Sequence, residues 1–298
     1  MRKILQDKVA IVTGAGGGLG RAHALELARH GARVVVNDLG GDAEGSTARA
    51  VVAEIERTGG EALVDGGDVR DYGQMEAMVG KALAKWGRVD ILVNNAGILR
   101  DKTFAKMALE DFRLVLDVHV MGAANCTKAV WNHMREQRHG RIVMTTSSSG
   151  LYGSFGQANY GAAKMALVGM MQTLAIEGAK HDIRVNCLAP SAATGMTADV
   201  LPEAALAGLR PDKVSPGLVA LVVDDAPTRM ILLAGAGSFE SAHVTMTRGV
   251  FIDGGDDTAI QVRDRLHEIQ DRRIEVVPES GWEQYQLELA KAGLSDRA

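Results

Sequence analysis

Short apolar runs alternate with longer helical patterns through the first two-thirds of the chain. The apolar runs are residues 9–12, 33–36, 61–64, 91–93, 141–144 and 183–185. The segments between them, at 20–30, 45–58, 72–86, 110–137 and 160–180, contain no proline and are long enough for helices. This alternation predicts an α/β fold with a doubly wound parallel sheet and helices on both of its faces.

The pattern loosens after Pro190. Residues 191–216 carry Ser, Thr, Gly and three prolines, which predicts a mobile loop over a functional site. A helix around 215–225 and a last strand at 249–253 are expected to complete the sheet.

The end of the chain forms a helical tail in this interpretation. Two sets of apolar residues lie at helical spacing and predict two short amphipathic helices: Val262, Leu266 and Ile269, then Trp282, Tyr285 and Leu289. Residues 1–255 are expected to form one domain, because no linker or repeat divides them. Residues 256–298 are expected to pack on this core or on a neighbouring subunit.

Charge and hydropathy then narrow the class of protein. The 298 residues carry a formal net charge of −4, and no run of Lys and Arg exceeds two residues, which argues against nucleic acid or an anionic membrane as the main partner. No apolar run reaches the roughly 18–20 residues that span a bilayer, and the first residues lack the apolar stretch of a signal peptide. A cytoplasmic protein with no metal site is expected.

A glycine-rich turn joins the first predicted strand to the first helix. It contains Gly14, Gly17, Gly18, Leu19 and Gly20. Glycines let the backbone turn tightly and approach a pyrophosphate at the helix N-terminus. Such a string can also be a plain tight turn, but its place between strand and helix predicts dinucleotide binding.

Asp38, at the end of the second strand, predicts which dinucleotide is bound. A carboxylate there accepts hydrogen bonds from the ribose hydroxyls and repels a 2′-phosphate, so NAD is expected rather than NADP. The alternative is that Asp38 only caps the next turn. No Lys or Arg follows at 39–41 or lies within 14–18, and Arg21 and Arg33 should begin on the helix and the strand.

Tyr160 and Lys164 are four residues apart, and therefore on one face of a helix. A phenol has a pKa near ~10, and a close cation favours the phenolate and brings it toward working pH. Ser147 follows the strand at 141–144 and can hydrogen-bond the same substrate oxygen; Ser148 and Ser149 are alternatives on spacing. With a dinucleotide, this set predicts hydride transfer at an alcohol or ketone carbon.

These motifs together resemble the short-chain dehydrogenase/reductase superfamily over about residues 6–255. The matching features are the glycine turn, Asn-Asn-Ala-Gly at 94–97, the Ser147, Tyr160 and Lys164 set, and Asp-Gly-Gly at 253–255. The resemblance implies a one-domain Rossmann fold, a homodimer or homotetramer, and an oxidoreductase that interconverts a secondary alcohol and a ketone.

The resemblance also implies roles for single residues. Tyr160 is the acid/base, Lys164 lowers its pKa and binds the nicotinamide ribose, and Ser147 positions the substrate oxygen. Further positions expected to contact or support the cofactor are Asp68, Val69, Asn95, Ala96, Gly97, Pro190, Ala193 and Thr194.

Two positions depart from the family pattern. Where the family usually has an Asn that helps hold a proton-relay water, this chain has His119. Neutral imidazole can also bind water, so His119 is interpreted as a relay residue, with a packing role as the alternative. Ser191 replaces the common Gly after Pro190, which leaves the backbone of 191–195 and the contacts of Thr194 open.

Segments 34–41, 94–101 and 156–160 look more narrowly like the (3R)-hydroxyacyl-CoA dehydrogenase part of the peroxisomal multifunctional enzyme and its bacterial relatives. That branch uses NAD and implies an acyl-CoA substrate. A 3-oxoacyl carrier-protein reductase is the first alternative, although Asp38 and the tail from 256 to 298 argue against it. A hydroxysteroid dehydrogenase fits the motifs equally. A dinucleotide-sensing regulator would predict loss of the catalytic set, which is present.

Overall fold

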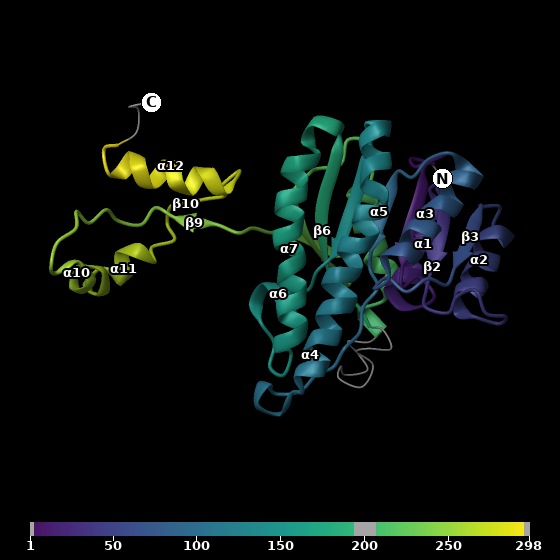
Figure 1. Ribbon diagram of the computed structural model, residues 1–298, viewed down its shortest axis with the longest axis horizontal. Coiled ribbons are helices and arrows are strands. Elements are labelled where there is room, and N and C mark those ends of the chain that lie inside the picture. Colours follow the sequence, from purple (N-terminus) through teal and green to yellow (C-terminus); the bar gives the residue numbers. More distant parts are fainter. Residues whose placement is uncertain (1–2, 194–206, 295–298) are drawn as a thin grey trace. The chain divides into compact units, whose positions relative to one another are not determined.

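An eight-stranded sheet lies at the centre of the first of two compact units, Met1–Ser241 and Ala242–Ala298. The computed structural model (Figure 1) describes residues 3–193 and 207–294. The strands are β1 (Val9–Thr13), β2 (Arg33–Asn37), β3 (Ala62–Asp65), β4 (Ile91–Asn94), β5 (Gly140–Thr145), β6 (Ile183–Ser191), β7 (Ile231–Gly235) and β8 (Ser238–Ala242).

The strand order is β3-β2-β1-β4-β5-β6-β7-β8, and every neighbouring pair from β3 to β7 is parallel. The chain leaves β1 toward one edge and returns beside it as β4. The two halves of the sheet therefore diverge between β1 and β4, and ligands of doubly wound folds bind at this point, outside the carboxyl ends of the strands.

Helices cover both faces of the sheet. They are α1 (Gly18–Arg29), α2 (Thr47–Arg57), α3 (Tyr72–Trp86), α4 (Leu109–Leu116), α5 (Gly122–Gln137), α6 (Ser148–Tyr152), α7 (Ala158–Gly178) and α9 (Ser215–Ala220). Side chains of α1, α2 and α9 share one buried cluster with alternate residues of β1 and β2, such as Ala10 and Val34. The alternate residues that point to the other face, such as Ile11 and Val35, are buried too. Both faces of these strands are therefore apolar, which explains their continuous apolar runs in the sequence.

The six strands predicted from the apolar runs are all present. The helical pattern at 110–137 is present as α4 and α5, but a π-helical turn, η2 (Asp117–Met121), separates them. π-helical turns are rare and frequently occur at functional sites.

The prediction of a last strand at 249–253 is wrong. The seventh parallel strand is instead β7, an apolar run that was not predicted as a strand, and β8 follows it at the edge. Residues 249–253 lie in the second unit without regular structure, and Phe251 is half exposed. The Asp-Gly-Gly motif at 253–255 therefore does not mark the end of the sheet.

The second unit contains a two-stranded antiparallel ribbon and three short helices. The elements are β9 (Met246–Thr247), α10 (Thr258–Asp264), α11 (Leu266–Ile269), β10 (Glu275–Val276) and α12 (Gly281–Lys291). The two predicted tail helices are present, the first one divided into α10 and α11. Of the helices in the described ranges, none has both the length and the apolar character to span a membrane.

Candidate active site

The predicted site residues lie along one edge of the sheet. Thr13, Asn94 and Thr145 end β1, β4 and β5, and the residues that follow each strand supply the glycine turn, Asn95 and Ser147. Because the strands are parallel, their carboxyl ends lie at the same edge. Sequence positions as distant as 14 and 147 therefore belong to one site.

The glycine turn has the shape that a pyrophosphate needs. Helix α1 begins after Gly17 with no side chain capping its N-terminus, and a Cβ on Gly17 would meet no atom within 4 Å. A Cβ on Gly20 would lie 2.1 Å from the carbonyl oxygen of Gly14, so this close turn requires glycine. The uncapped N–H groups and the open backbone fit a dinucleotide's phosphates.

Asp38 lies beside the same turn. Its Oδ2 accepts a hydrogen bond from the backbone N–H of Gly16 at 2.7 Å. Arg21 and Arg33, which could have turned toward a 2′-phosphate, are engaged elsewhere: Arg21 donates to Glu54 at 2.5 Å and Arg33 to Asp7 at 2.9 Å. The surroundings of Asp38 thus fit a ribose with free hydroxyls.

A hydrogen-bond network joins β1 to the loop after β4. Asn95 Nδ2 donates to the carbonyl oxygens of Thr13 at 2.8 Å and Gly14 at 3.2 Å. The Thr13 hydroxyl accepts from the backbone N–H groups of Asn95 and Ala96 at 3.0 and 3.1 Å. Asn95 therefore supports the glycine turn from behind. Thr13 was not singled out from the sequence, where it is one strand-end threonine.

Asp68 and Val69 follow β3, the outermost strand of the sheet on the side of β2. The carboxylate of Asp68 accepts from Arg70 Nε at 2.9 Å, and this contact lowers the pKa of Asp68. Val69 is buried, and its carbonyl oxygen accepts from Asn125 Nδ2 at 3.0 Å. Buried Asp65, which the sequence reading did not select, binds Lys81 at 2.8 Å nearby.

Ser147, Tyr160 and Lys164 come together where β5 ends and α7 begins. Lys164 is buried and its Nζ donates to the carbonyl oxygen of Thr145 at 2.6 Å. The same Nζ lies 5.4 Å from the centre of the Tyr160 ring. Ser147 caps α6 by accepting from the backbone N–H of Ser149 at 3.2 Å. The Ser149 hydroxyl is instead engaged with the Ser154 hydroxyl, at 3.0 Å.

The protonation of these groups is set mainly by burial. Burial raises the pKa of the Tyr160 phenol, while a hydrogen bond with the Ser147 side chain opposes the rise. Burial also lowers the pKa of Lys164 to about 7. The protein's own residues thus raise the pKa of Tyr160, opposite in sign to the lowering expected from Lys164.

His119 lies within the π-helical turn η2 and faces Tyr160. The two rings meet edge to face with centroids 5.3 Å apart. His119 Nε2 lies 3.1 Å from the N–H and 2.9 Å from the carbonyl oxygen of Ile98, and either tautomer can use one of these contacts. Burial, together with the charge of Lys164, lowers the pKa of His119 to about 3, so the imidazole is neutral.

Gly97 makes room for this histidine. A Cβ on Gly97 would lie 2.3 Å from Cε1 of His119, so any larger residue would displace the ring. The glycine of the Asn-Asn-Ala-Gly motif is therefore required here by the side chain on η2.

A small cavity borders His119 and Lys164. It has a volume of about 10 Å³ and is lined in part by Thr13, Asn94, His119 and Lys164. His119 Nδ1 and Asn94 Oδ1 are buried without a hydrogen-bond partner among the described residues. A polar cavity of this size is about the smallest that holds one water, and buried polar atoms need partners.

Of the remaining predicted cofactor contacts, the structure describes Pro190 and Ala193 but not Thr194. Pro190 lies in β6, and the Ala193 N–H donates to the Leu209 carbonyl oxygen at 2.6 Å. Thr194 lies outside the described residues. Within residues 3–193 and 207–294, no group of three or more His, Cys, Asp or Glu side chains gathers as metal ligands.

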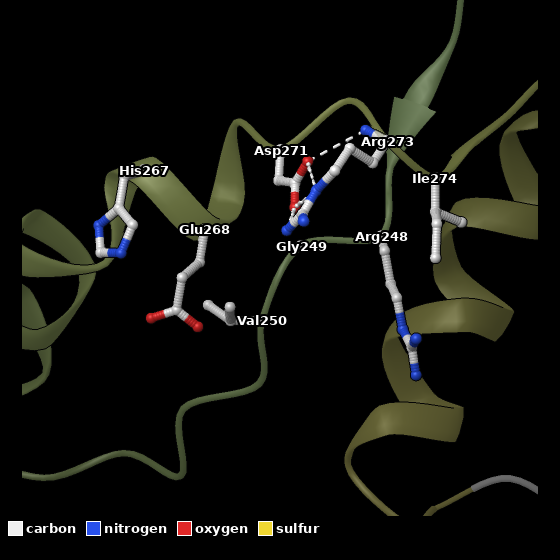
Figure 2. A pocket seen from close by; sticks show the side chains of 8 residues that line it. All are labelled: Arg248, Gly249, Val250, His267, Glu268, Asp271, Arg273 and Ile274. Carbon is white, nitrogen blue, oxygen red and sulfur yellow. Dashed lines mark hydrogen bonds and ion pairs between the residues drawn. The ribbon is translucent and has the colours of Figure 1, made fainter.

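A second hollow, of about 600 Å³, lies in the second unit (Figure 2). Its acidic side chains already have partners: Asp271 binds Arg273 at 2.9 Å, and Glu268 binds Arg265 at 2.8 Å. Within the described chain, none of its lining residues belongs to the predicted catalytic set.

The doubly wound sheet, the glycine turn and Tyr160 beside the buried Lys164 define a dinucleotide-binding oxidoreductase. The sequence model of the short chain dehydrogenase family matches residues 8–205. The chain belongs to that family.

Two curated relatives and one solved structure are close. The chain is 46% identical to peroxisomal multifunctional enzyme A of Dictyostelium discoideum over 271 residues, which are 89% of this chain and 60% of that protein. It is 51% identical to peroxisomal multifunctional enzyme type 2 of Mus musculus over 217 residues, 70% of this chain and 29% of that protein. The chain thus spans only part of the length of these relatives.

The solved structure is a short chain dehydrogenase from Mycobacterium avium. It superimposes with a TM-score of 0.80 at 37% identity, over 93% of this chain and 99% of that one. Because 93% of this chain is matched, the match includes most of the second unit.

Proposed function

We propose that this enzyme interconverts a (3R)-hydroxyacyl-CoA and the corresponding 3-oxoacyl-CoA, with NAD as the hydride carrier. The observation that carries the proposal is the intact set of Ser147, Tyr160 and Lys164 in a chain 51% identical to a peroxisomal multifunctional enzyme. In the sequence resemblance, this set of residues belongs to the (3R)-hydroxyacyl-CoA dehydrogenase part of such an enzyme.

In the proposed reaction, NAD, when bound, would supply the hydride acceptor for the carbinol carbon. The Tyr160 oxygen takes the hydroxyl proton in oxidation and returns it in reduction. Ser147 donates a hydrogen bond to the same substrate oxygen and holds it beside Tyr160. Lys164, fixed by the Thr145 carbonyl oxygen at 2.6 Å, would hold the nicotinamide ribose hydroxyls.

We propose that His119 and Asn94 hold a water in the cavity beside Lys164. The imidazole can donate from Nδ1 or accept there, depending on the Ile98 group that Nε2 uses. The water would link Lys164 to His119 and extend the hydrogen-bonding groups available to a proton released at Tyr160. Because the pKa of His119 is about 3, the residue acts as a neutral hydrogen-bonding group.

The choice of NAD is part of the proposal. Asp38 supports it, since a carboxylate bound to the Gly16 N–H would meet the 2′-phosphate of NADP with like charge. Asp68, Val69, Pro190, Ala193 and Thr194 are proposed as further cofactor contacts. We also propose a homodimer or homotetramer and a cytoplasmic location, which light scattering and cell fractionation would test.

The test measures the rate of NADH or NADPH formation by absorbance across a panel of substrates. It contains (3R)- and (3S)-hydroxyacyl-CoAs, hydroxysteroids, simple secondary alcohols and a 3-hydroxyacyl carrier protein, each with NAD and with NADP. We expect the highest kcat/KM for (3R)-hydroxyacyl-CoA with NAD. A higher kcat/KM for a hydroxysteroid, or for the carrier-protein substrate with NADP, would overturn the proposal.

A further inference from the structure

A loop beside the catalytic helix is fixed to the residues that precede Tyr160. The loop follows β4 and leads through a short 3-10 turn, η1 (Phe104–Lys106), into α4. The Lys102 N–H donates to the Gly156 carbonyl oxygen at 2.9 Å. Buried Asn159 donates from Nδ2 to the Arg100 carbonyl oxygen at 3.0 Å. The loop therefore lies at the rim of the site, next to the start of α7 (Figure 1).

This rim exposes two phenylalanines. The exposed fraction is 71% for Phe104 and 94% for Phe155, which precedes Gly156 in the loop between α6 and α7. Because Lys102 is bonded to Gly156, the two aromatic side chains belong to adjoining loops. Large apolar side chains that are this exposed at a site entrance indicate a binding surface.

The same rim carries positive charge. Lys102 and Lys106 are exposed, and among the described residues neither ammonium has an ion-pair partner. Asp101, the acid between Arg100 and Lys102, is held by Gln157 Nε2 at 2.6 Å. Arg100, Lys102 and Lys106 therefore outnumber the single carboxylate of Asp101 in this loop, which is net positive in a chain whose net charge is −4.

We propose that Lys102, Phe104, Lys106 and Phe155, the entrance patch, bind the phosphates and adenine of the coenzyme A that carries the acyl substrate. The inference rests on the proposed function and adds the residues that recognise the carrier. Ammonium groups suit phosphates as point charges, and exposed aromatic rings suit the flat face of a base. The two exposed phenylalanines favour a nucleotide over an acidic carrier protein, because the lysines alone would suffice for an acidic surface.

The experiment compares two substrates with one acyl group. One is the hydroxyacyl-CoA, and the other is its N-acetylcysteamine thioester, which lacks the nucleotide. In Lys102→Gln/Lys106→Gln we expect KM for the CoA substrate to rise about tenfold, from about threefold for each exposed ion pair, with kcat within about twofold. Phe104→Ala should also raise that KM. KM for the short thioester should stay unchanged.

Lys180→Gln is the matched control, since Lys180 is an exposed lysine beyond the other end of α7. It should leave both KM values unchanged. Added NaCl should raise KM for the CoA substrate in the wild type and much less in the double variant, because salt screens exposed charges.

Calorimetric titration with free coenzyme A separates this inference from the proposed function. If neither thioester is oxidised, the proposed function fails, but coenzyme A should still bind the wild type more tightly than the double variant. Equal coenzyme A affinity in the two proteins would overturn the inference. A loss confined to an acyl carrier protein substrate would also overturn it and assign the entrance patch to that protein.

Discussion

Single residues hold most of the chemistry, and burial sets their protonation. Lys164 has a pKa of about 7 in the folded protein against an ordinary value of 10.5, because it is fully buried. His119 is neutral for the same reason. Sequence spacing could predict that Lys164 and Tyr160 share a helix face. It could not predict these pKa directions, which depend on the strands packed around them.

The buried lysine makes stability depend on pH. Between pH 7 and 10.5 the unfolded chain binds more protons at Lys164 than the folded protein, so the free energy of unfolding should rise with pH. The slope is at most about 1.4 kcal/mol per pH unit. Cys126 and Cys187 have a pKa raised to about 12, which has the opposite effect above their ordinary 9.0, so the useful window is pH 7 to 8.5.

Urea unfolding of the wild type and Lys164→Met across that window measures the effect. The wild type should gain stability with pH relative to the variant. Parallel pH dependences in the two proteins would mean that Lys164 is not shifted by burial.

Asp38 determines the cofactor in this account. Asp38→Ala should weaken NAD binding by about ten- to a hundredfold, because a hydrogen-bonded carboxylate contributes about 1.5–3 kcal/mol, and should relax rejection of NADP. Dissociation constants for both dinucleotides, measured by NADH and NADPH fluorescence, test this. The interpretation is wrong if the wild type already binds NADPH more tightly than NADH.

At the scale of elements, six of the seven parallel strands were predictable, whereas β7 and the irregular segments were not. The six strands from β1 to β6 follow from apolar runs buried on both faces. The prediction of a strand at 249–253 was wrong because an Asp-Gly-Gly motif follows it, as it follows the last strand in the family pattern. In this protein β7 is the last parallel strand. The π-helical turn η2 leaves no mark on a helical apolar pattern, so it could not be predicted.

The turn η2 positions His119 beside Tyr160 and at the wall of the small cavity.

If His119 holds a water there, His119→Asn should retain activity within about fivefold, since an amide can donate and accept. His119→Leu should lose at least about a hundredfold, as expected for a group in the proton path. Steady-state kcat and Tm of both variants separate catalysis from packing. Equal, near-wild-type kcat in both would return His119 to a packing role.

At the scale of the whole molecule, the second unit is not required by the sheet, which is complete at β8. It nevertheless exposes large apolar side chains, and the exposed fraction is 72% for Trp282, 52% for Tyr285 and 45% for Leu266. Burial of such residues stabilises short helices, which are marginal alone in water. We therefore propose that this part packs on the core or on a neighbouring subunit.

Ending the chain at His243 keeps β8 and removes the rest of the second unit. The shortened protein should show fewer subunits per particle by light scattering or a lower Tm, while NADH fluorescence still reports binding at the glycine turn. If the number of subunits, Tm and kinetics all match the full chain, the second unit has neither role.

The central claim is that Tyr160 moves the proton while hydride passes between the substrate and NAD. The most direct measurement is single-turnover formation of NADH by Tyr160→Phe, with NADH affinity measured in parallel. The ring is retained and only its oxygen is lost, so binding should stay within about twofold while the rate falls by about 10²–10⁴-fold. A variant that keeps more than half of the wild-type rate would contradict the account.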